Sequence, residues 1–123
     1  MGARRLRISL AGQSFAGLVR EERCARCGQR FTSYEEVHRF ELGCAVETAE
    51  AGAMRPDVVL ALCRGIAVET TPIARLLGVR RETVYRWQTG RSPIGRAAFL
   101  TLILLARDRL AGRDDTRRLL ERL

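Results

Sequence analysis

Residues 73–90 read IARLLGVRRETVYRWQTG, and this stretch decides the fold. Its first part carries apolar residues at positions i, i+3 and i+4, which is the spacing of one buried helix face. These residues are Ile73, Leu76 and Leu77. Gly78 follows, and glycine readily takes the left-handed conformation that a sharp helix exit requires. A second helical rhythm then begins, with Val79, Val84 and Trp87 on its apolar side. The stretch therefore predicts a helix-turn-helix, in which a tight glycine turn joins two short helices.

The second of these helices presents polar and mostly basic side chains on its other side. They are Arg80, Arg81, Glu82, Tyr85 and Arg86. In a helix-turn-helix, the second helix enters the major groove of DNA with its N-terminal residues toward the base edges. We therefore expect Arg81 and Glu82 to set the sequence preference. Tyr85 and Arg86 would assist from one turn further along.

The positive charge of the chain is concentrated around this motif. The chain has 123 residues and a net charge of +8, and all 22 of its basic residues are arginine. Residues 1–52 hold eight arginines and seven acidic residues, which gives +1, whereas residues 53–123 hold fourteen arginines and seven acidic residues, which gives +7. A basic second half is what an anionic partner such as double-stranded DNA requires.

The segment ARLLGVRRETVYRWQTGRSPI resembles the helix-turn-helix core of the Xre/Cro-type bacterial and phage regulators. That family commonly reads A-x-x-L-G-V-S and then x-x-T-V-S-R-W-E-N-G. The matching residues here are Ala74, Leu77, Gly78, Val79, Thr83, Val84, Arg86, Trp87 and Gly90. The resemblance implies a five-helix, λ-repressor-like DNA-binding domain.

A few positions depart from the family pattern. Arg80 stands where a serine or threonine helix cap is usual, which removes about 1 kcal/mol of helix stability and places a cation near the DNA. Thr70 stands where the family usually places a glutamine against a phosphate, Tyr85 replaces a small polar residue, and Gln88-Thr89 replace Glu-Asn. The residues that we expect to contact DNA are Thr70, Thr71, Arg80, Arg81, Glu82, Tyr85, Arg86 and Arg91.

The N-terminal part of the chain reads as a small β-hairpin followed by a helix. Leu6, Ile8 and Leu10 alternate with polar residues, which is the period of a half-buried strand, and residues 15–20 can form a returning strand. Ser33 and Glu36 have the spacing of a capping box. They predict the start of a helix that runs to Ala51. We expect residues 1–52 to form this module and residues 53–123 to form the DNA-binding domain.

The second half reads as five helices, so the predicted fold class is mainly α. Pro56 and Asp57 suit the first turn of a helix, and Thr71-Pro72 reads as the cap and first residue of the next. After the helix-turn-helix, residues 95–111 form a segment that is apolar almost all round, which indicates burial on more than one side. Asp114-Asp115 can start a last helix. The apolar surplus in residues 99–105 predicts a homodimer formed mainly through this half.

Cys24-x-x-Cys27-Gly28 has the form of a metal-binding knuckle, with two thiolates on a tight turn. Structural zinc needs four ligands, so one CxxC supplies half a site, and three alternatives stay open. His38 and Cys44 could complete the site, although two residues six apart lie ~120° off a common helix face. A second chain could donate its own pair. Without metal, the pair stays free or forms a redox-labile link, and packing alone must hold the hairpin.

The order of elements resembles the layout of MqsA-type antitoxins. In those proteins an N-terminal zinc-binding domain contacts a partner toxin, and the C-terminal helix-turn-helix domain binds DNA as a dimer. The resemblance implies a possible toxin partner here. The second CxxC that is usual in the family is absent from this chain.

The sequence excludes several other classes of function. No apolar run approaches the ~20 residues of a membrane span, and the start lacks the continuous apolar core of a signal peptide, so we expect a cytoplasmic protein without a membrane segment. His38 is the sole histidine and has no paired acid or nucleophile, which argues against an enzyme. We expect a dimeric, sequence-specific transcriptional regulator. The alternative is a protein-interaction module that binds a toxin or polymerase and contacts DNA secondarily.

Overall fold

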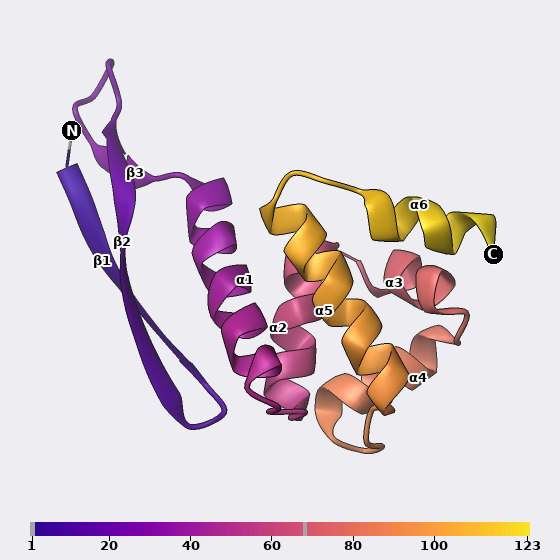
Figure 1. Ribbon diagram of the computed structural model, residues 1–123. Coiled ribbons are helices and arrows are strands. Elements are labelled where there is room, and N and C mark those ends of the chain that lie inside the picture. The colour runs from indigo at the N-terminus through magenta and orange to yellow at the C-terminus, as the bar shows by residue number, and fades with distance from the viewer. Residues whose placement is uncertain (1, 68) are drawn as a thin grey trace.

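This computed structural model describes residues 2–67 and 69–123. Within these residues, a three-stranded antiparallel sheet lies at one end of the molecule and six helices lie beside it (Figure 1). The fold is mixed rather than mainly α, and it includes the small hairpin and the helices that the sequence pattern predicted. The third strand was not predicted.

The sheet has the strand order β1-β2-β3, with β1 at Gly2–Leu10, β2 at Gln13–Arg23 and β3 at Arg30–Thr32. Leu10 pairs with Gln13, so a two-residue turn joins the first two strands. Both turn residues, Ala11 and Gly12, have positive φ, at 51° and 76°, which is the conformation that matches the twist of paired strands.

Helix α1 (Tyr34–Glu50) carries the sheet on one of its faces. Phe40 of α1 lies directly beneath Gly17 of β2, where an added Cβ would come 2.2 Å from the ring. Ile8 and Phe15 also pack against the core, whereas Phe31 is 48% exposed. Packing from both strands of the hairpin therefore attaches it to α1.

The predicted capping box at the start of α1 is wrong. Ser33 is the N-cap residue, but its side chain makes no capping hydrogen bond. Glu36 instead accepts a hydrogen bond from the backbone N–H of Arg20, with 2.7 Å between Oε2 and N. Because β3 pairs with only residues 21–23 of β2, this carboxylate satisfies an edge donor of the sheet.

The second half contains α2 (Pro56–Ile66), α3 (Thr70–Leu77), α4 (Arg81–Thr89), α5 (Arg96–Leu110) and α6 (Asp115–Arg122). The expectation that Thr71-Pro72 begins α3 is wrong by two residues, because the helix starts at Thr70 with Glu69 as its N-cap. At the start of α6, the Asp108 carboxylate accepts a hydrogen bond from the Thr116 N–H, 2.9 Å away. This bond ties α6 to the end of α5.

One hydrophobic core joins the turn of the hairpin to helices α1, α2, α3, α4 and α5. Its largest fully buried side chains are Leu62, Ile73, Leu102, Val58, Val59, Val84 and Cys63. The expected apolar surplus of residues 99–105 is smaller than predicted, since Phe99, Leu102, Ile103 and Leu105 are buried within the chain. Leu100 and Leu104 remain exposed, at 55% and 40%. Among the described residues, no helix has the length and hydrophobicity to cross a membrane.

Candidate nucleic-acid interface

The turn between α3 and α4 has the geometry that the sequence predicted. Gly78 ends α3 in the left-handed conformation, with φ 68° and ψ 30°. The Val79 N–H donates to the carbonyl of Ala74 (3.0 Å), and the Gly78 N–H donates to the carbonyl of Arg75 (3.2 Å). These two bonds form a Schellman motif. The turn is therefore closed by backbone bonds, and α4 leaves it in a fixed direction.

Helix α4 is held from below by two buried side chains. Val84 is fully buried and Trp87 is 8% exposed, and both belong to the main core. At the end of the helix, Gly90 has φ 79°, and an added Cβ there would lie 3.2 Å from the ring of Pro56. The close approach to the start of α2 fixes the far end of α4. One face of this helix is thus anchored, and the opposite face is open to solvent.

The open face carries the residues expected to contact DNA. Arg80, Arg81, Glu82, Tyr85 and Arg86 are all exposed, as are Thr71 and Arg91. The guanidinium of Arg81 lies over the ring of Tyr85, 5.7 Å from its centroid, in a cation–π arrangement. This contact positions Arg81 along the helix while leaving its N–H donors free.

The arginines of this face have no acidic partners within the part of the chain that the structure describes. The ion pairs found there involve Arg55, Arg107, Arg117 and Arg118. Arg80, the N-cap residue of α4, makes no side-chain capping bond, so the N–H groups of Arg81 and Glu82 in the first turn have no cap, whereas that of Thr83 donates to the Arg80 carbonyl (3.0 Å). Free guanidinium groups beside an uncapped helix N-terminus favour a bound anion.

Thr70 and Tyr85 come together in a shallow hollow of about 190 Å³ between α2, α3 and α4. Two residues that the sequence reasoning missed, Arg64 and Gln88, line the same hollow. Gln88 also hydrogen-bonds the thiol of Cys63, whose pKa is raised by burial and partly lowered by that bond. Arg64 lies in the last turn of α2, where only the packing of α2 against α4 brings it to this surface.

The Cys24–Cys27 knuckle lies at the far end of the sheet, away from α4 (Figure 1). The Gly28 N–H donates to the carbonyl of Cys24, the Cys24 N–H donates to the carbonyl of Gln29, both at 2.9 Å, and Gly28 has φ 71°. Hydrogen bonds to the Cys24 sulfur from the backbone N–H groups of Cys27 and Arg26 lower the pKa of its thiol. Both cysteines are free thiols. The turn is shaped to hold a thiolate.

The structure does not gather His38 and Cys44 with Cys24 and Cys27 into one group. The His38 ring packs at a tilt against that of Tyr34, with 4.3 Å between centroids, and Cys44 is buried in the core. Nowhere in residues 2–67 and 69–123 do three or more His, Cys, Asp or Glu side chains form a group that could hold a metal. The two thiols fit half of a tetrahedral zinc site, and the described part of this chain does not supply the other half.

Comparison of the chain with protein-family models, with curated proteins and with solved structures finds no match.

Proposed function

We propose that this protein is a sequence-specific, double-stranded-DNA-binding transcriptional regulator of the Xre-like kind, that it acts in the cytoplasm and that it has no enzymatic activity. The observation that carries the proposal is the face of α4. It presents arginines without acidic partners in the described chain, on a helix whose other side is fixed in the core by Val84 and Trp87. A rigid helix with free guanidinium groups suits the reading of base edges.

Contacts to DNA would divide between bases and phosphates. Arg81 and Glu82 occupy the first turn of α4, from which side chains reach base edges in a major-groove complex. A bidentate arginine–guanine contact contributes about 1–3 kcal/mol of discrimination. Arg91, Thr70 and Thr71 lie outside α4 and would contact phosphates, which position the protein without reading sequence.

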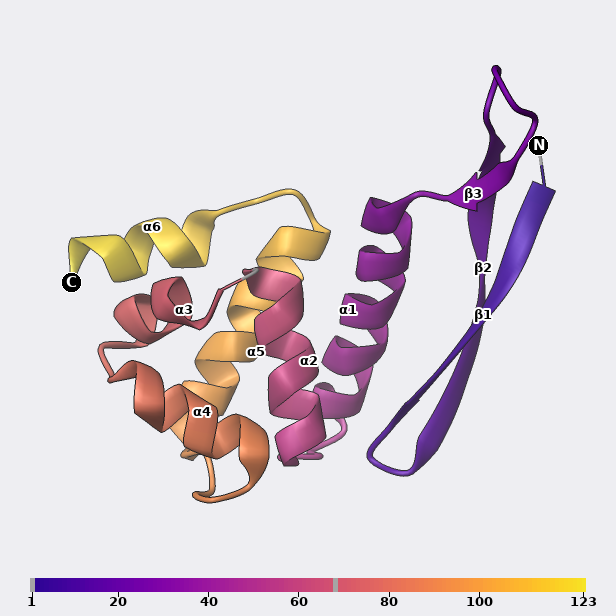
Figure 2. The same cartoon turned by 180° about the vertical axis from the view of Figure 1, so that it is seen from behind.

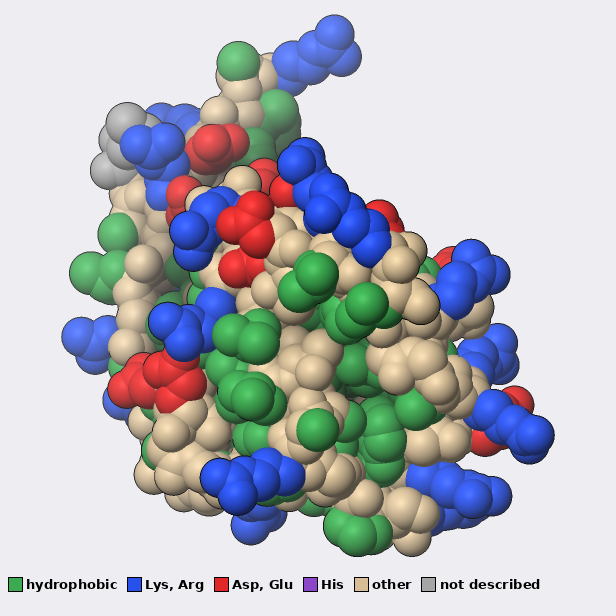
Figure 3. Space-filling model, turned by 45° about the vertical axis from the view of Figure 1, so that its right-hand side comes forward, with side chains coloured by type: hydrophobic (Ala, Val, Ile, Leu, Met, Phe, Trp, Pro, Cys, Tyr) green, Lys and Arg blue, Asp and Glu red, His purple; other side chains and the backbone are tan. Residues whose placement is uncertain are grey.

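A homodimer is the assembly that we propose for binding. Leu100 and Leu104 lie one turn apart on α5 and are exposed, and hydrophobic side chains gather on the face that includes α5 and α6, with arginines around them (Figure 3). Two copies joined through α5 by a two-fold axis would present two α4 helices. Half-sites of such dimers are ~34 Å apart, one turn of DNA.

A salt titration of DNA binding tests the proposal. Affinity for duplex genomic fragments, followed by fluorescence anisotropy, should fall with a slope of about −0.9 per phosphate contacted in log K against log salt. On the fragment bound most tightly, Arg81→Ala should cost about 1–3 kcal/mol and relax discrimination. Arg122→Ala, which removes an arginine of α6, is the matched control and should leave affinity unchanged.

Two results would contradict the proposal. Affinity that does not respond to salt would exclude phosphate contacts as the main source of binding. If Arg81→Ala weakens binding to all sequences equally, Arg81 contacts phosphate and does not read bases.

The alternative, a protein-interaction module such as an antitoxin, is favoured by one surface. On the side of the hairpin that faces away from α1, Arg5 pairs with Leu18 and Ala3 pairs with Arg20 across the strands. Leu18 is 71% exposed. Exposed arginines beside a large apolar side chain suit an acidic protein partner. Absence of duplex binding together with loss of a co-purifying partner in Leu18→Glu would favour this function.

A further inference from the structure

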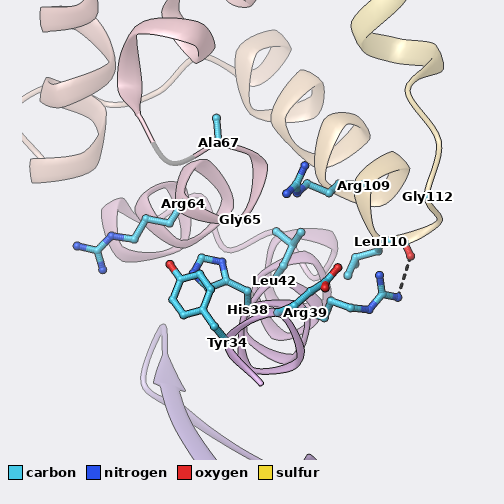
Figure 4. A pocket seen from close by; sticks show the side chains of 11 residues that line it. Tyr34, His38, Arg39, Leu42, Arg64, Gly65, Ala67, Arg109, Leu110 and Gly112 are labelled. Atoms are coloured by element: carbon cyan, nitrogen blue, oxygen red, sulfur yellow. Dashed lines mark hydrogen bonds between the residues drawn. The ribbon is translucent and has the colours of Figure 1, made fainter. Parts of the chain in front are cut away.

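A cavity of about 400 Å³ opens where the start of α1 meets the C-terminal ends of α2 and α5. Its floor is apolar and includes Leu42 and Leu110 (Figure 4). Small-molecule sites usually have volumes of ~300–1,000 Å³ with a mostly apolar lining and a few polar groups that fix orientation. The cavity shares Arg64 and Ala67 with the hollow between α2, α3 and α4, but no residue of α4 or of the knuckle lines it.

The walls of the cavity carry more positive than negative charge. Arg39, Arg64 and Arg109 line it, against one carboxylate, that of Glu35. None of the three arginines has a carboxylate within ion-pair distance in the described residues. Arg39 donates one hydrogen bond to the carbonyl of Leu110, 2.9 Å away, and so offsets the negative end of α5. The guanidinium of Arg109 makes no hydrogen bond to any other described residue.

One wall is aromatic. The rings of Tyr34 and His38 pack against each other at a tilt, with 4.3 Å between centroids and 44° between planes, and they lie across Leu42 from Arg109 (Figure 4). Tyr34 is 73% exposed, so its ring is accessible to a ligand. A flat apolar group can lie against this wall, and an attached anionic group can then reach the arginines opposite.

We propose that this cavity binds a small aromatic anion, with the ring against Tyr34 and His38 and the carboxylate or phosphate at Arg109. Carboxylates and phosphates share the planar, bidentate recognition that a guanidinium offers. The site touches α1, α2 and α5, so a bound ligand stabilises the folded protein by mass action.

Three ligands with one ring system test the charge requirement. 1-Naphthoate, 1-naphthyl phosphate and the uncharged 1-naphthalenemethanol are titrated by calorimetry into the full, untagged chain. At least one anion should bind about tenfold or more tightly than the alcohol, because one charge-assisted hydrogen bond contributes that much. The tighter of the two anions identifies the source as carboxylate or phosphate. His38 is the sole histidine, so a shift of its imidazole proton NMR signals reports binding beside its ring. A second hollow, between the hairpin, α1 and α2, also contains His38 but not Arg109, so the Arg109 variant distinguishes the two.

Matched arginine variants locate the anionic group. Arg109→Gln should weaken the anion about tenfold and leave the alcohol unchanged, whereas Arg122→Gln, on α6 outside the cavity, should change neither. Thermal melts establish first that each variant folds. The proposal is overturned if neither anion binds at about 1 mM, if anion and alcohol bind equally, if the His38 signals stay in place, or if the two arginine variants behave alike.

Discussion

The Asp57 carboxylate links the hairpin turn to the start of α2 through two hydrogen bonds, one on each oxygen. Its Oδ2 accepts from the N–H of Ala11 in the hairpin turn (2.9 Å), and its Oδ1 accepts from the N–H of Val58 (3.0 Å) at the start of α2. Burial alone would raise the pKa of Asp57, but the hydrogen bonds from Ala11, Arg55 and Val58 outweigh it and hold the pKa below its usual range. The carboxylate form therefore stabilises the attachment of the hairpin.

Removing the charge of Asp57 should make stability less sensitive to acid. A carboxyl whose pKa is depressed by folding contributes stability above its unfolded pKa of about 3.9 and loses it as pH falls through the native value. Asp57→Asn should cost about 1 kcal/mol at pH 7, a modest figure because the side chain is 43% exposed and screened by water. The difference from the native protein, measured by urea unfolding, should shrink between about pH 5 and pH 3.

The control is Asp115→Asn. Asp115 is exposed, and within the described residues its carboxylate accepts no hydrogen bond. A pH-independent cost for Asp57→Asn, equal to that of Asp115→Asn, would show that Asp57 does not hold the turn through its charge.

The sequence predicted the role of a residue correctly where that role depends on residues close to it in the chain. The exposed face of α4 and the glycine exit at Gly78 follow from spacings of three to five residues. The partners of Glu36 and Asp57 lie 16 and 46 residues away, so the sequence assigned these acids to a capping box and a helix dipole. Spacing along a chain does not specify such partners, because they depend on how the hairpin lies on the helices.

At the scale of elements, a glycine decides how closely the hairpin approaches α1. An added Cβ at Gly17 would lie 2.2 Å from Cε2 of Phe40, so Gly17→Ala must move the strand or the ring. Overpacking of this kind typically costs about 1–3 kcal/mol. Gly43→Ala is the matched control, since no atom lies within 4 Å of its added Cβ, and removing a mid-helix glycine should stabilise α1 by about 0.5–1 kcal/mol.

Thermal unfolding of Gly17→Ala and Gly43→Ala measures the change in stability that each substitution causes. Phe40→Leu in the Gly17→Ala background should restore part of the loss, because a smaller side chain makes room. If Gly17→Ala and Gly43→Ala change stability in the same direction, the contact between β2 and Phe40 does not limit the approach.

The hairpin should persist without its cysteines. Its attachments include the Phe40 contact and the hydrogen bonds that the Arg20 and Ala11 N–H groups donate to Glu36 and Asp57, none of which involves the knuckle. Cys24→Ser combined with Cys27→Ser should therefore change the stability of an isolated chain by no more than about 0.5 kcal/mol. Amide hydrogen exchange of β1 and β2, in protein purified under reducing conditions with a chelator, measures the result.

Loss of protection throughout residues 2–23 in that variant would mean that the cysteines hold the module. Metal analysis of untreated protein then separates the two zinc arrangements. One zinc per two chains supports a site shared between copies, and one per chain supports a site completed within the chain.

Helices with an amphipathic period were predicted well, and the shortest strand was not predicted. Helices α2 and α4 follow the spacing of their buried residues, such as Val58, Leu62 and Val84, whereas α5 was predicted from a segment that is apolar almost all round. Strand β3 has three residues, too few for an alternating pattern to emerge. It exists because the knuckle turns the chain back along residues 21–23 of β2.

At the scale of the whole molecule, the sheet and the face of α4 lie at opposite ends, with α1 and α2 between them (Figure 2). DNA bound at α4 would leave the outer surface of the hairpin accessible to a partner. The exposed leucines of α5 belong to a third surface. Three surfaces of different chemistry can therefore be tested by separate substitutions.

Charge placed on α5 should dissociate the proposed dimer. Leu100→Glu with Leu104→Glu puts two carboxylates on a face that is now apolar, and like charges would meet across a two-fold axis. Sedimentation should show a monomer at concentrations where the native chain is a dimer. Because both side chains are substantially exposed, the fold should change in stability by about 0.5 kcal/mol or less.

DNA affinity tests whether Leu100 and Leu104 form the dimer interface or are only exposed side chains. A dimer that uses two half-sites gains from effective concentration, often 10²-fold or more, so the double variant should lose affinity for a palindromic duplex but not for a single half-site. Leu18→Glu, on the outer surface of the hairpin, is the matched control and should leave both the dimer and DNA affinity unchanged. If the α5 double variant sediments as a dimer and binds the palindrome normally, the two chains associate through another surface, and the half-site spacing must be derived from that surface instead.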